Sequence, residues 1–230
     1  MSEFENKIHD DVRGIFKSAW TETKGQVVPK SEDLGLSNVG RSISATILYA
    51  DIDGSTQIVD RYDAKFAAEV YKAFLLCATR VIRLNGGEVR SFDGDRVMGV
   101  FIGDSKNSDA AKTGLQINYL VKKAINPALK DQYTSTKFSL RHTVGIDTSE
   151  MLVVRSGIRN NNDLVWVGSA ANNAARMNSL SSDFATRLTP AVYKKLNERS
   201  KFGGNPRRNM WTSADWNGQT IYRSSWTWRP

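Results

Sequence analysis

An apolar run at residues 43–50 ends in an aspartate, and this segment constrains the fold of the chain more than any other. Asp51 is followed by Ile52-Asp53-Gly54-Ser55-Thr56, which is typical of a strand that passes through a tight turn into a helix. A buried strand seldom ends in a carboxylate without a use for it, because charged side chains are mostly exposed unless they are paired. The segment therefore predicts a strand, a functional turn and a helix in that order.

A second carboxylate, Asp95, lies beyond the Asp93-Gly94 turn, between strand-like runs at 88–92 and 95–101. Carboxylate oxygens at neighbouring strand ends are the ligands that hard cations such as Mg²⁺ prefer. Together with Asp51, Asp95 predicts the minimum apparatus for two-metal phosphoryl chemistry. Simpler interpretations stay open at this point, since Asp-Gly is a common hairpin turn and Ser55 or Thr56 is an ordinary helix cap.

The periodicity of the remaining chain predicts alternating helices and strands. An amphipathic helix is expected at 3–20, a loop at 24–41, and a long helix from Ser55 or Thr56 to Asn85. A second long helix is expected from Ser108 towards Pro127. The later elements are expected as a strand at 137–146 that pairs with 151–154, a strand at 164–167, a helix from 168, a strand near 188, a helix from 190 and a hairpin around Asn217-Gly218.

Composition narrows the class of protein. No apolar stretch approaches the roughly 20 residues that span a bilayer, and the N-terminus lacks a secretory signal, so we expect a cytoplasmic protein that binds no membrane. The single cysteine, Cys77, has the spacing of a buried helix residue, and His142 falls in an alternating strand as a core residue. Any metal is therefore expected to have oxygen ligands.

The net charge of +8 is concentrated near the C-terminus, where residues 187–230 hold nine Lys or Arg against two acids. A solvated basic face, a rim that attracts triphosphates and a nucleic-acid surface all remain possible from charge alone. Four of the six tryptophans also lie after Met210, and we expect them to pack on the core rather than to stack on bases.

A third fragment, Gly168-Ser-Ala-Ala-Asn172-Asn-Ala-Ala-Arg176, favours a helix. Asn172 and Arg176 are four residues apart, so both side chains project from one face. In this order, the three fragments resemble the class III nucleotidyl cyclase catalytic domain, and the resemblance covers residues 43–228. The resemblance implies one fold, an α/β sandwich of the α+β type, with a ferredoxin-like core and a mostly antiparallel sheet. We accordingly expect an N-terminal helix and loop at 1–41 and a catalytic domain at 42–230.

The resemblance also implies roles for individual residues. Asp51, Asp95 and the carbonyl of Ile52 would hold two Mg²⁺ or Mn²⁺ ions. Backbone amides of Asp53, Gly54, Ser55 and Thr56 would face the triphosphate. Asn172 would orient the ribose, and Arg176 would meet the charge that develops on the transferred phosphoryl group. In this family the Asn and Arg come from the opposite subunit, so a homodimer with shared active sites is implied.

The positions that read the base differ from the purine cyclases of the family. They correspond here to Ser91 and Val165, where neither a Lys with Asp or Thr nor a Glu with Cys is present. The chain looks most like the pyrimidine cyclases of bacterial Pycsar anti-phage systems, which make cyclic UMP or cyclic CMP for a separate effector. Tyr49, Arg90 and Phe92 are then candidates for the base pocket, and UTP is expected over CTP.

One lysine that the family uses for the triphosphate has no match, and Arg207 or Arg208 is the expected substitute. Several alternatives remain: an adenylate or guanylate cyclase, a cyclase-like domain that binds nucleotide without turnover, and a nucleic-acid-binding module. Intact Asp51, Asp95 and Arg176 argue against a silent domain, and no nucleic-acid partner is expected.

Overall fold

The computed structural model describes residues 2–230, which divide into two compact units. The first unit combines the described residues up to 44 with 150–168, and the second combines 45–149 with 169–230. The described part of the segment 1–41, for which we expected a separate helix and loop, lies within the first unit. Two long strands, β2 (Val39–Ile52) and β5 (His142–Ile158), run through both units.

The first unit consists of helix α1 (Glu3–Lys17), strand β1 (Thr21–Lys24), the short 3-10 helix η1 (Ser31–Asp33) and strand β6 (Asn161–Val167). Strand β1 pairs in parallel with the start of β2, and β6 pairs antiparallel with the end of β5. The expected loop at 24–41 is thus interrupted by η1 and ends where β2 begins. Helix α1 buries none of its residues in the described chain.

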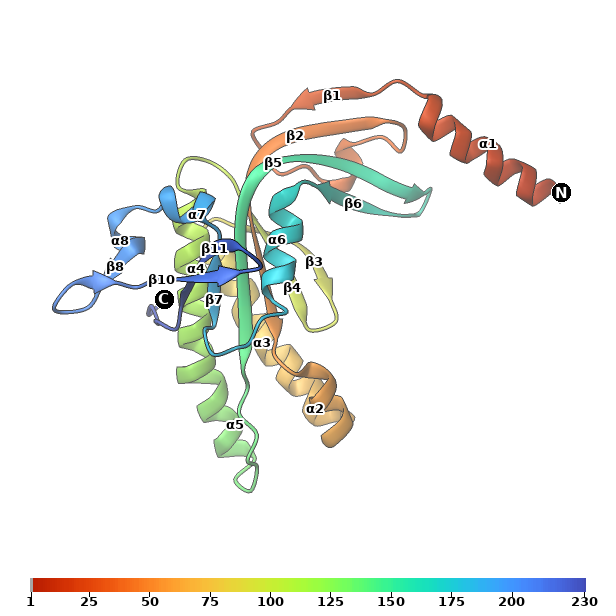
Figure 1. The fold of residues 1–230 in the computed structure, drawn as a ribbon. Helices are drawn as coiled ribbons and strands as arrows, with labels where there is room; N and C mark the ends of the chain where they lie inside the picture. The colour runs from red at the N-terminus through yellow and green to blue at the C-terminus, as the bar shows by residue number, and fades with distance from the viewer. Residues whose placement is uncertain (1) are drawn as a thin grey trace. The chain divides into compact units, whose positions relative to one another are not determined.

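The second unit is built on a sheet with the strand order β10-β11-β7-β5-β2-β4-β3 (Figure 1). Most of its pairings are antiparallel, and β5 with β7 is parallel. The predicted mixed fold with a mainly antiparallel sheet is therefore confirmed. The other strands of this path are β3 (Glu88–Asp93), β4 (Arg96–Phe101), β7 (Thr186–Leu188), β10 (Thr212–Trp216) and β11 (Gln219–Ser224).

Helices cover both faces of this sheet. On one face, α3 (Ala64–Leu84) and α4 (Lys106–Leu120) pack over a core that includes Phe74, Leu115 and Ile146 (Figure 1). On the other face lies α6 (Ser169–Met177), close to Gly145 of β5. A Cβ at Gly145 would lie 2.1 Å from the Ala174 carbonyl oxygen, so only glycine permits this approach.

Two helix predictions need correction. The long helix expected from residue 55 is broken into α2 (Ser55–Arg61) and α3, because Asp63 caps α3 by accepting hydrogen bonds from the amides of Lys65 and Phe66 at 2.9 and 3.1 Å. The second long helix begins two residues before Ser108 and does not end at Pro127. It continues through a π-turn, η2 (Val121–Ile125), into α5 (Asn126–Gln132), where Pro127 occupies the first turn.

The expected pairing of 151–154 with the strand before it is wrong, because both belong to the continuous strand β5. The polar residues between them remain extended since they have partners on other elements. Asp147 accepts hydrogen bonds from Asn173 and Thr189, and Thr148 donates to the Ala45 carbonyl. The true partner of 152–158 is β6.

The C-terminal region has the predicted strand, helix and hairpin. Helices α7 (Pro190–Lys194) and α8 (Glu198–Lys201) precede the small β8 (Phe202–Gly203) and β9 (Arg208–Asn209) pair and the β10–β11 hairpin. Trp211 and Trp216 are buried, and Trp226 and Trp228 pack against the core. The tryptophans therefore have the structural role that we expected. No helix within residues 2–230 is long and apolar enough to cross a membrane.

Candidate active site

The turn after β2 brings the first carboxylate to the end of the sheet. Gly54 caps α2 with a φ of 75°, a left-handed conformation that glycine adopts without strain. Tyr71 of α3 donates a hydrogen bond of 3.2 Å to the Ser55 carbonyl and so holds the start of α2. The resulting turn presents Asp51, Asp53 and the first α2 amides at one end of the sheet.

Asp95 lies beside Asp51 because β4 is the neighbour of β2. The register Ala50↔Val97 places the turn between β3 and β4 next to the end of β2. Arg96 donates to Asp51 Oδ2 from both Nε and Nη2 at 3.1 Å. Sequence reasoning assigned no role to Arg96, since its pairing depends on the strand register.

The electrostatics of this pair fit a bound cation. The pKa of Asp51 is raised to about 6. Burial is the largest cause, the negative charge of Asp95 adds to the rise, and Arg96 opposes it. Oδ2 of Asp95 is buried without a hydrogen-bond partner. A buried carboxylate oxygen without a partner is costly, and a divalent cation would remove that cost. No group of three or more His, Cys, Asp or Glu side chains that could hold a metal occurs within residues 2–230, so further ligands must come from backbone, water or substrate.

Metal binding at this pair is expected to depend on pH around 6. The pKa of Asp51 is 3.8 in the unfolded chain and about 6 in the folded protein. Between these two pH values, folded Asp51 holds a proton that the unfolded chain has released. The stability of the metal-free protein therefore falls as pH rises through this window. A cation competes with that proton, and its apparent affinity at pH 5 should be about tenfold lower than at pH 7.5. Thermal unfolding with increasing Mn²⁺ at both pH values measures this difference.

The matched control is Asp51→Asn, which cannot titrate. It should lose the Mn²⁺-dependent rise in Tm at pH 7.5 and should show no Asp51-dependent stability loss between pH 4 and 6 without metal. Equal stabilisation of the unmodified protein by Mn²⁺ at pH 5 and pH 7.5 would contradict the assignment of the metal to this pair.

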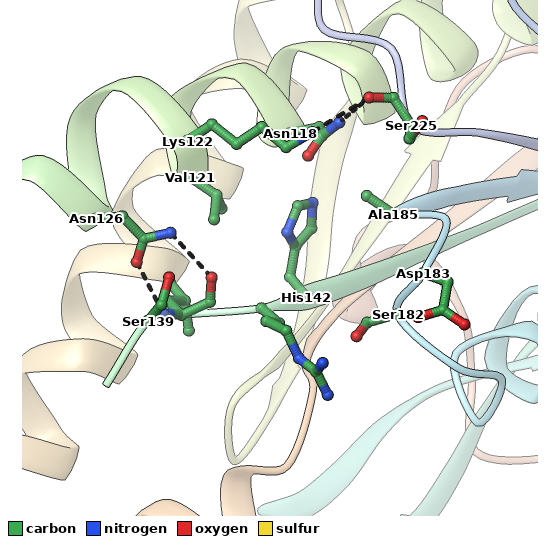
Figure 2. A pocket seen from close by; sticks show the side chains of 12 residues that line it. Asn118, Val121, Lys122, Asn126, Ser139, His142, Ser182, Asp183, Ala185 and Ser225 are labelled. Carbon is green, nitrogen blue, oxygen red and sulfur yellow. Dashed lines mark hydrogen bonds between the residues drawn. The ribbon is translucent and has the colours of Figure 1, made fainter. Parts of the chain in front are cut away.

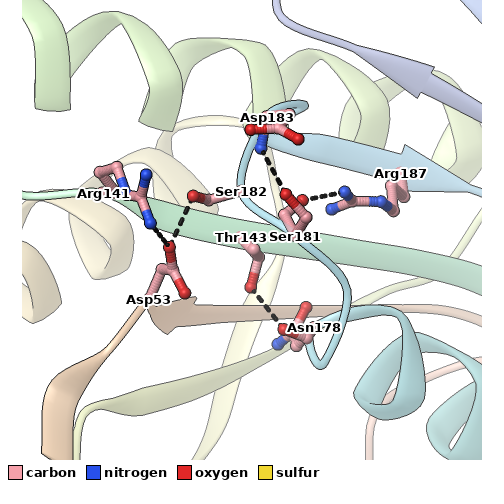
Figure 3. Close-up of polar contacts among 8 residues, drawn as sticks. All are labelled: Asp53, Arg141, Thr143, Asn178, Ser181, Ser182, Asp183 and Arg187. Carbon is pink, nitrogen blue, oxygen red and sulfur yellow. Dashed lines mark hydrogen bonds and ion pairs between the residues drawn. The ribbon is translucent and has the colours of Figure 1, made fainter.

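Asp53 is held by two residues that the sequence analysis did not select (Figure 3). Its carboxylate accepts hydrogen bonds from Arg141 Nη2 at 2.8 Å and from Ser182 Oγ at 2.5 Å. Its amide donates to the Arg141 carbonyl at 2.9 Å. The Asp53 amide is therefore already used in this structure, and the amides of Gly54, Ser55 and Thr56 remain as candidates for an anionic ligand.

A cavity of about 300 Å³ adjoins this turn and is lined by three cationic side chains. Arg61 comes from α2, while Lys137 and Arg141 come from the segment that leads into β5. The two arginines that we expected near the triphosphate lie elsewhere, in and beside the β8–β9 pair. Arg207 is paired with Glu198 at 2.7 Å, and the Arg208 guanidinium stacks on Trp226.

The expected base-pocket residues lie on β2, β3 and β6. Tyr49 is half-buried, its hydroxyl lies 3.3 Å from Met98 Sδ, and the Arg96 guanidinium lies 5.9 Å from its ring centroid. Ser91 is half-buried, Phe92 is exposed, and Arg90 has a buried Nε without a partner. Val165 lies on β6, in the first unit, and its side chain is exposed.

Asn172 and Arg176 lie on one exposed face of α6, as the sequence predicted. The Arg176 guanidinium lies 5.1 Å from the ring centroid of Trp216, which belongs to the edge strand β10. Three strands separate β10 from β2, which corresponds to roughly 19 Å at about 4.8 Å per step. Helix α6 itself packs on β5, the neighbour of β2, so this separation applies to Trp216 and not to α6 as a whole.

His142 has the core position that we expected and is fully buried on β5. Burial lowers its pKa to about 3, and nearby Lys122 adds to this effect, so the imidazole is neutral near pH 7. Its ring borders a separate cavity of about 270 Å³ between α4 and the segment before β7 (Figure 2). Cys77 is half-buried, and burial raises the pKa of its thiol.

Comparison with known proteins gives one consistent result. The profile of the adenylate and guanylate cyclase catalytic domain matches residues 38–220. The chain is 46% identical to a protein of Xanthomonas perforans named uridylate cyclase, with 94% of each chain covered. It is 45% identical to a Burkholderia cepacia protein of the same name, with 93% of each covered.

Solved cyclase structures share the fold. The guanylyl cyclase Cya2 has a TM-score of 0.68 at 18% identity, covering 83% of this chain and 96% of that one. The adenylyl cyclase CyaB from P. aeruginosa has a TM-score of 0.66 at 19% identity, covering 80% and 95%. The match over residues 38–220 and the near-full-length relatives show that the chain belongs to the adenylate and guanylate cyclase catalytic domain family.

Proposed function

We propose that this chain is a uridylate cyclase that converts UTP to 3′,5′-cyclic UMP and pyrophosphate as a homodimer. The observation that carries the proposal is the Asp51–Asp95 pair at the ends of β2 and β4, in a chain whose near-full-length relatives are named uridylate cyclase. In the reaction, the ribose 3′-oxygen forms a bond with the α-phosphorus while the bond to the pyrophosphate oxygen breaks.

Asp51, Asp95 and the carbonyl of Ile52 are the residues that would hold two Mg²⁺ or Mn²⁺ ions. When bound, such ions lower the pKa of the attacking hydroxyl and offset charge on the leaving pyrophosphate. Arg96 keeps the Asp51 carboxylate in place through its two hydrogen bonds.

The triphosphate is proposed to lie against the turn that follows β2. The amides of Gly54, Ser55 and Thr56 have no acceptor within the first turn of α2, as is general at helix starts. Arg61 and Lys137 line the adjoining cavity and add positive charge, which favours a polyanion there. These side chains, rather than Arg207 or Arg208, are our candidates for the role of the missing lysine.

Asn172 and Arg176 are proposed to reach the site of the second subunit. This assignment is supported by the exposure of both side chains and by the contact of Arg176 with Trp216 of β10, an edge strand that three strands separate from β2. Stacking on Trp216 restricts the Arg176 side chain, so less conformational freedom is lost when it meets the developing negative charge. Dimerisation would then complete two equivalent sites.

The base pocket is proposed to involve Tyr49, Arg90, Ser91, Phe92 and Val165. Small or apolar residues at 91 and 165 cannot supply the paired hydrogen bonds that a purine-reading site uses, so purine triphosphates should be poor substrates. Phe92 offers an exposed aromatic ring, and Arg90 offers a buried nitrogen without a partner. The cyclic product is proposed to act on a separate effector in anti-phage signalling.

Incubation with ATP, GTP, CTP and UTP in turn, with Mn²⁺ or Mg²⁺, tests the proposal. Mass spectrometry should show cyclic UMP as the main product, with the other three triphosphates converted at least about tenfold more slowly, the factor expected from loss of a single base contact. If cyclic CMP is the main product, the substrate is CTP and not UTP. If cyclic AMP or cyclic GMP is the main product, the assignment of the base pocket is refuted. No cyclic product from any triphosphate would refute the proposed activity.

A further inference from the structure

Helix α1 presents an apolar face that no described residue of the first unit covers. The helix is amphipathic, yet none of its residues is buried, and Phe16 is 85% exposed. Large exposed apolar faces are uncommon on soluble proteins and usually mark an interaction site. The exposed apolar side chains of α1 and the residues that follow it are Phe4, Ile8, Val12, Ile15, Phe16 and Trp20.

The C-terminal end of α1 is anchored to the rest of the first unit. The side-chain amide of Asn38 donates to the carbonyls of Ile15 and Ser18 at 2.8 and 2.9 Å. The Thr21 amide donates to the Asn38 carbonyl at 2.8 Å, where β1 begins beside β2. Ser2 caps the other end by accepting from the Glu5 amide. The helix is therefore capped and attached at a defined place, while its apolar side chains remain exposed.

We propose that a second copy of this chain covers the apolar face of α1. From typical side-chain areas, the six exposed side chains offer on the order of 600 Å² of apolar surface. One such contact alone is below the roughly 800 Å² per partner of a stable interface. A symmetric dimer makes the contact twice, so each partner buries its own α1 face and a similar area over the other α1 face, about 1,200 Å² per partner, which exceeds the size of a stable interface.

Charge also favours a second copy over a lipid surface. Interfacial membrane helices have polar faces rich in Lys and Arg. The acidic residues of α1 are Glu3, Glu5, Asp10 and Asp11, against Lys7, Arg13 and Lys17. The helix is thus slightly acidic, while the chain as a whole carries +8. A slightly acidic helix is attracted to a basic copy of the same protein and not to anionic headgroups.

Photocrosslinking of the full chain tests this proposal. Benzoylphenylalanine replaces Val12 at the centre of the apolar face, or Asp10 on the opposite face as the matched control. Irradiation of the Val12 variant should yield a covalent dimer of the chain, at least about fivefold more than the Asp10 variant. Mass spectrometry of the crosslinked peptides then identifies the surface of the second copy that covers α1.

Several results would overturn the proposal. These are crosslinks from position 12 only to the same chain, equal dimer yields from both positions, or no dimer crosslink at all. Co-sedimentation of the unmodified protein with phosphatidylcholine–phosphatidylglycerol vesicles should be negative, and binding that is lost in Ile8→Glu/Ile15→Glu would assign the face to lipid instead. The contact needs neither UTP nor metal, so the crosslinks are independent of whether the proposed activity is found.

Discussion

Asp51→Asn is expected to lower the rate of cyclic nucleotide formation by at least about a thousandfold, because several kcal/mol of transition-state stabilisation would be lost with the cation. The side chains are nearly equal in size, and the neutral amide resembles the protonated form that burial and Asp95 already favour. The fold should therefore remain intact in the absence of metal. Steady-state production of cyclic UMP, measured by mass spectrometry beside the Tm of each protein, provides the comparison.

Asp60→Asn is the matched control for this substitution. Asp60 is exposed on α2, nine residues from Asp51, and its replacement removes the same charge without touching the carboxylate pair. Its activity should stay within about twofold of the unmodified protein, as most surface substitutions change little. If Asp51→Asn kept more than a tenth of the activity, Asp51 would not be a metal ligand.

The carboxylate pair could be predicted because each half has a local signal. The apolar run before Asp51 and the Asp93-Gly94 turn both specify a strand end, and the family resemblance implied that these two ends lie side by side. The unpartnered Oδ2 of Asp95 and the double hydrogen bond from Arg96 were beyond prediction, since both depend on how β2 and β4 align. Periodicity gives the face of a side chain but not its partner on another strand.

The hydrogen bonds that hold the Asp53 carboxylate could not be predicted from local sequence. Arg141 and Ser182 are 88 and 129 residues away in sequence, and neither belongs to a recognisable motif. The division of the helix at Asp63 had a local signal, because an aspartate before a helical run is a favourable cap. It was missed because the apolar period continues across the break, from Ile58 to Phe66, without a visible change of phase.

The relation between Asp51 and Arg176 required the strand order. The sequence showed that Asn172 and Arg176 share a face of a helix, but only the order β10-β11-β7-β5-β2 shows that three strands lie between the strand of Trp216 and β2. Sequence spacing gives no such distance, since neighbours in a sheet need not be neighbours in the chain. The strand order therefore shows that the contact partner of Arg176, Trp216, belongs to an edge strand and not to a neighbour of β2.

Mixing Asp51→Asn with Arg176→Ala should restore activity that neither variant has alone. Removal of a preorganised charge such as Arg176 is expected to cost about a hundredfold to a thousandfold in rate. If subunits exchange freely in a symmetric dimer, half of the dimers are mixed and each keeps one intact site, which gives about a quarter of the full activity. Cyclic UMP production after an equimolar mixture has been allowed to exchange measures this recovery.

The control mixture combines Asp51→Asn with Asp95→Asn. Both substitutions remove a carboxylate that is proposed to hold the metal ions. Each site of a mixed dimer then lacks one of the two carboxylates, so the mixed dimer should remain inactive. Recovery in the first mixture but not in the second requires that Asp51 and Arg176 of one site come from different chains. If neither mixture recovers although exchange of subunits is confirmed, each chain must form its site alone, and the assignment of Arg176 to the partner's site would be wrong.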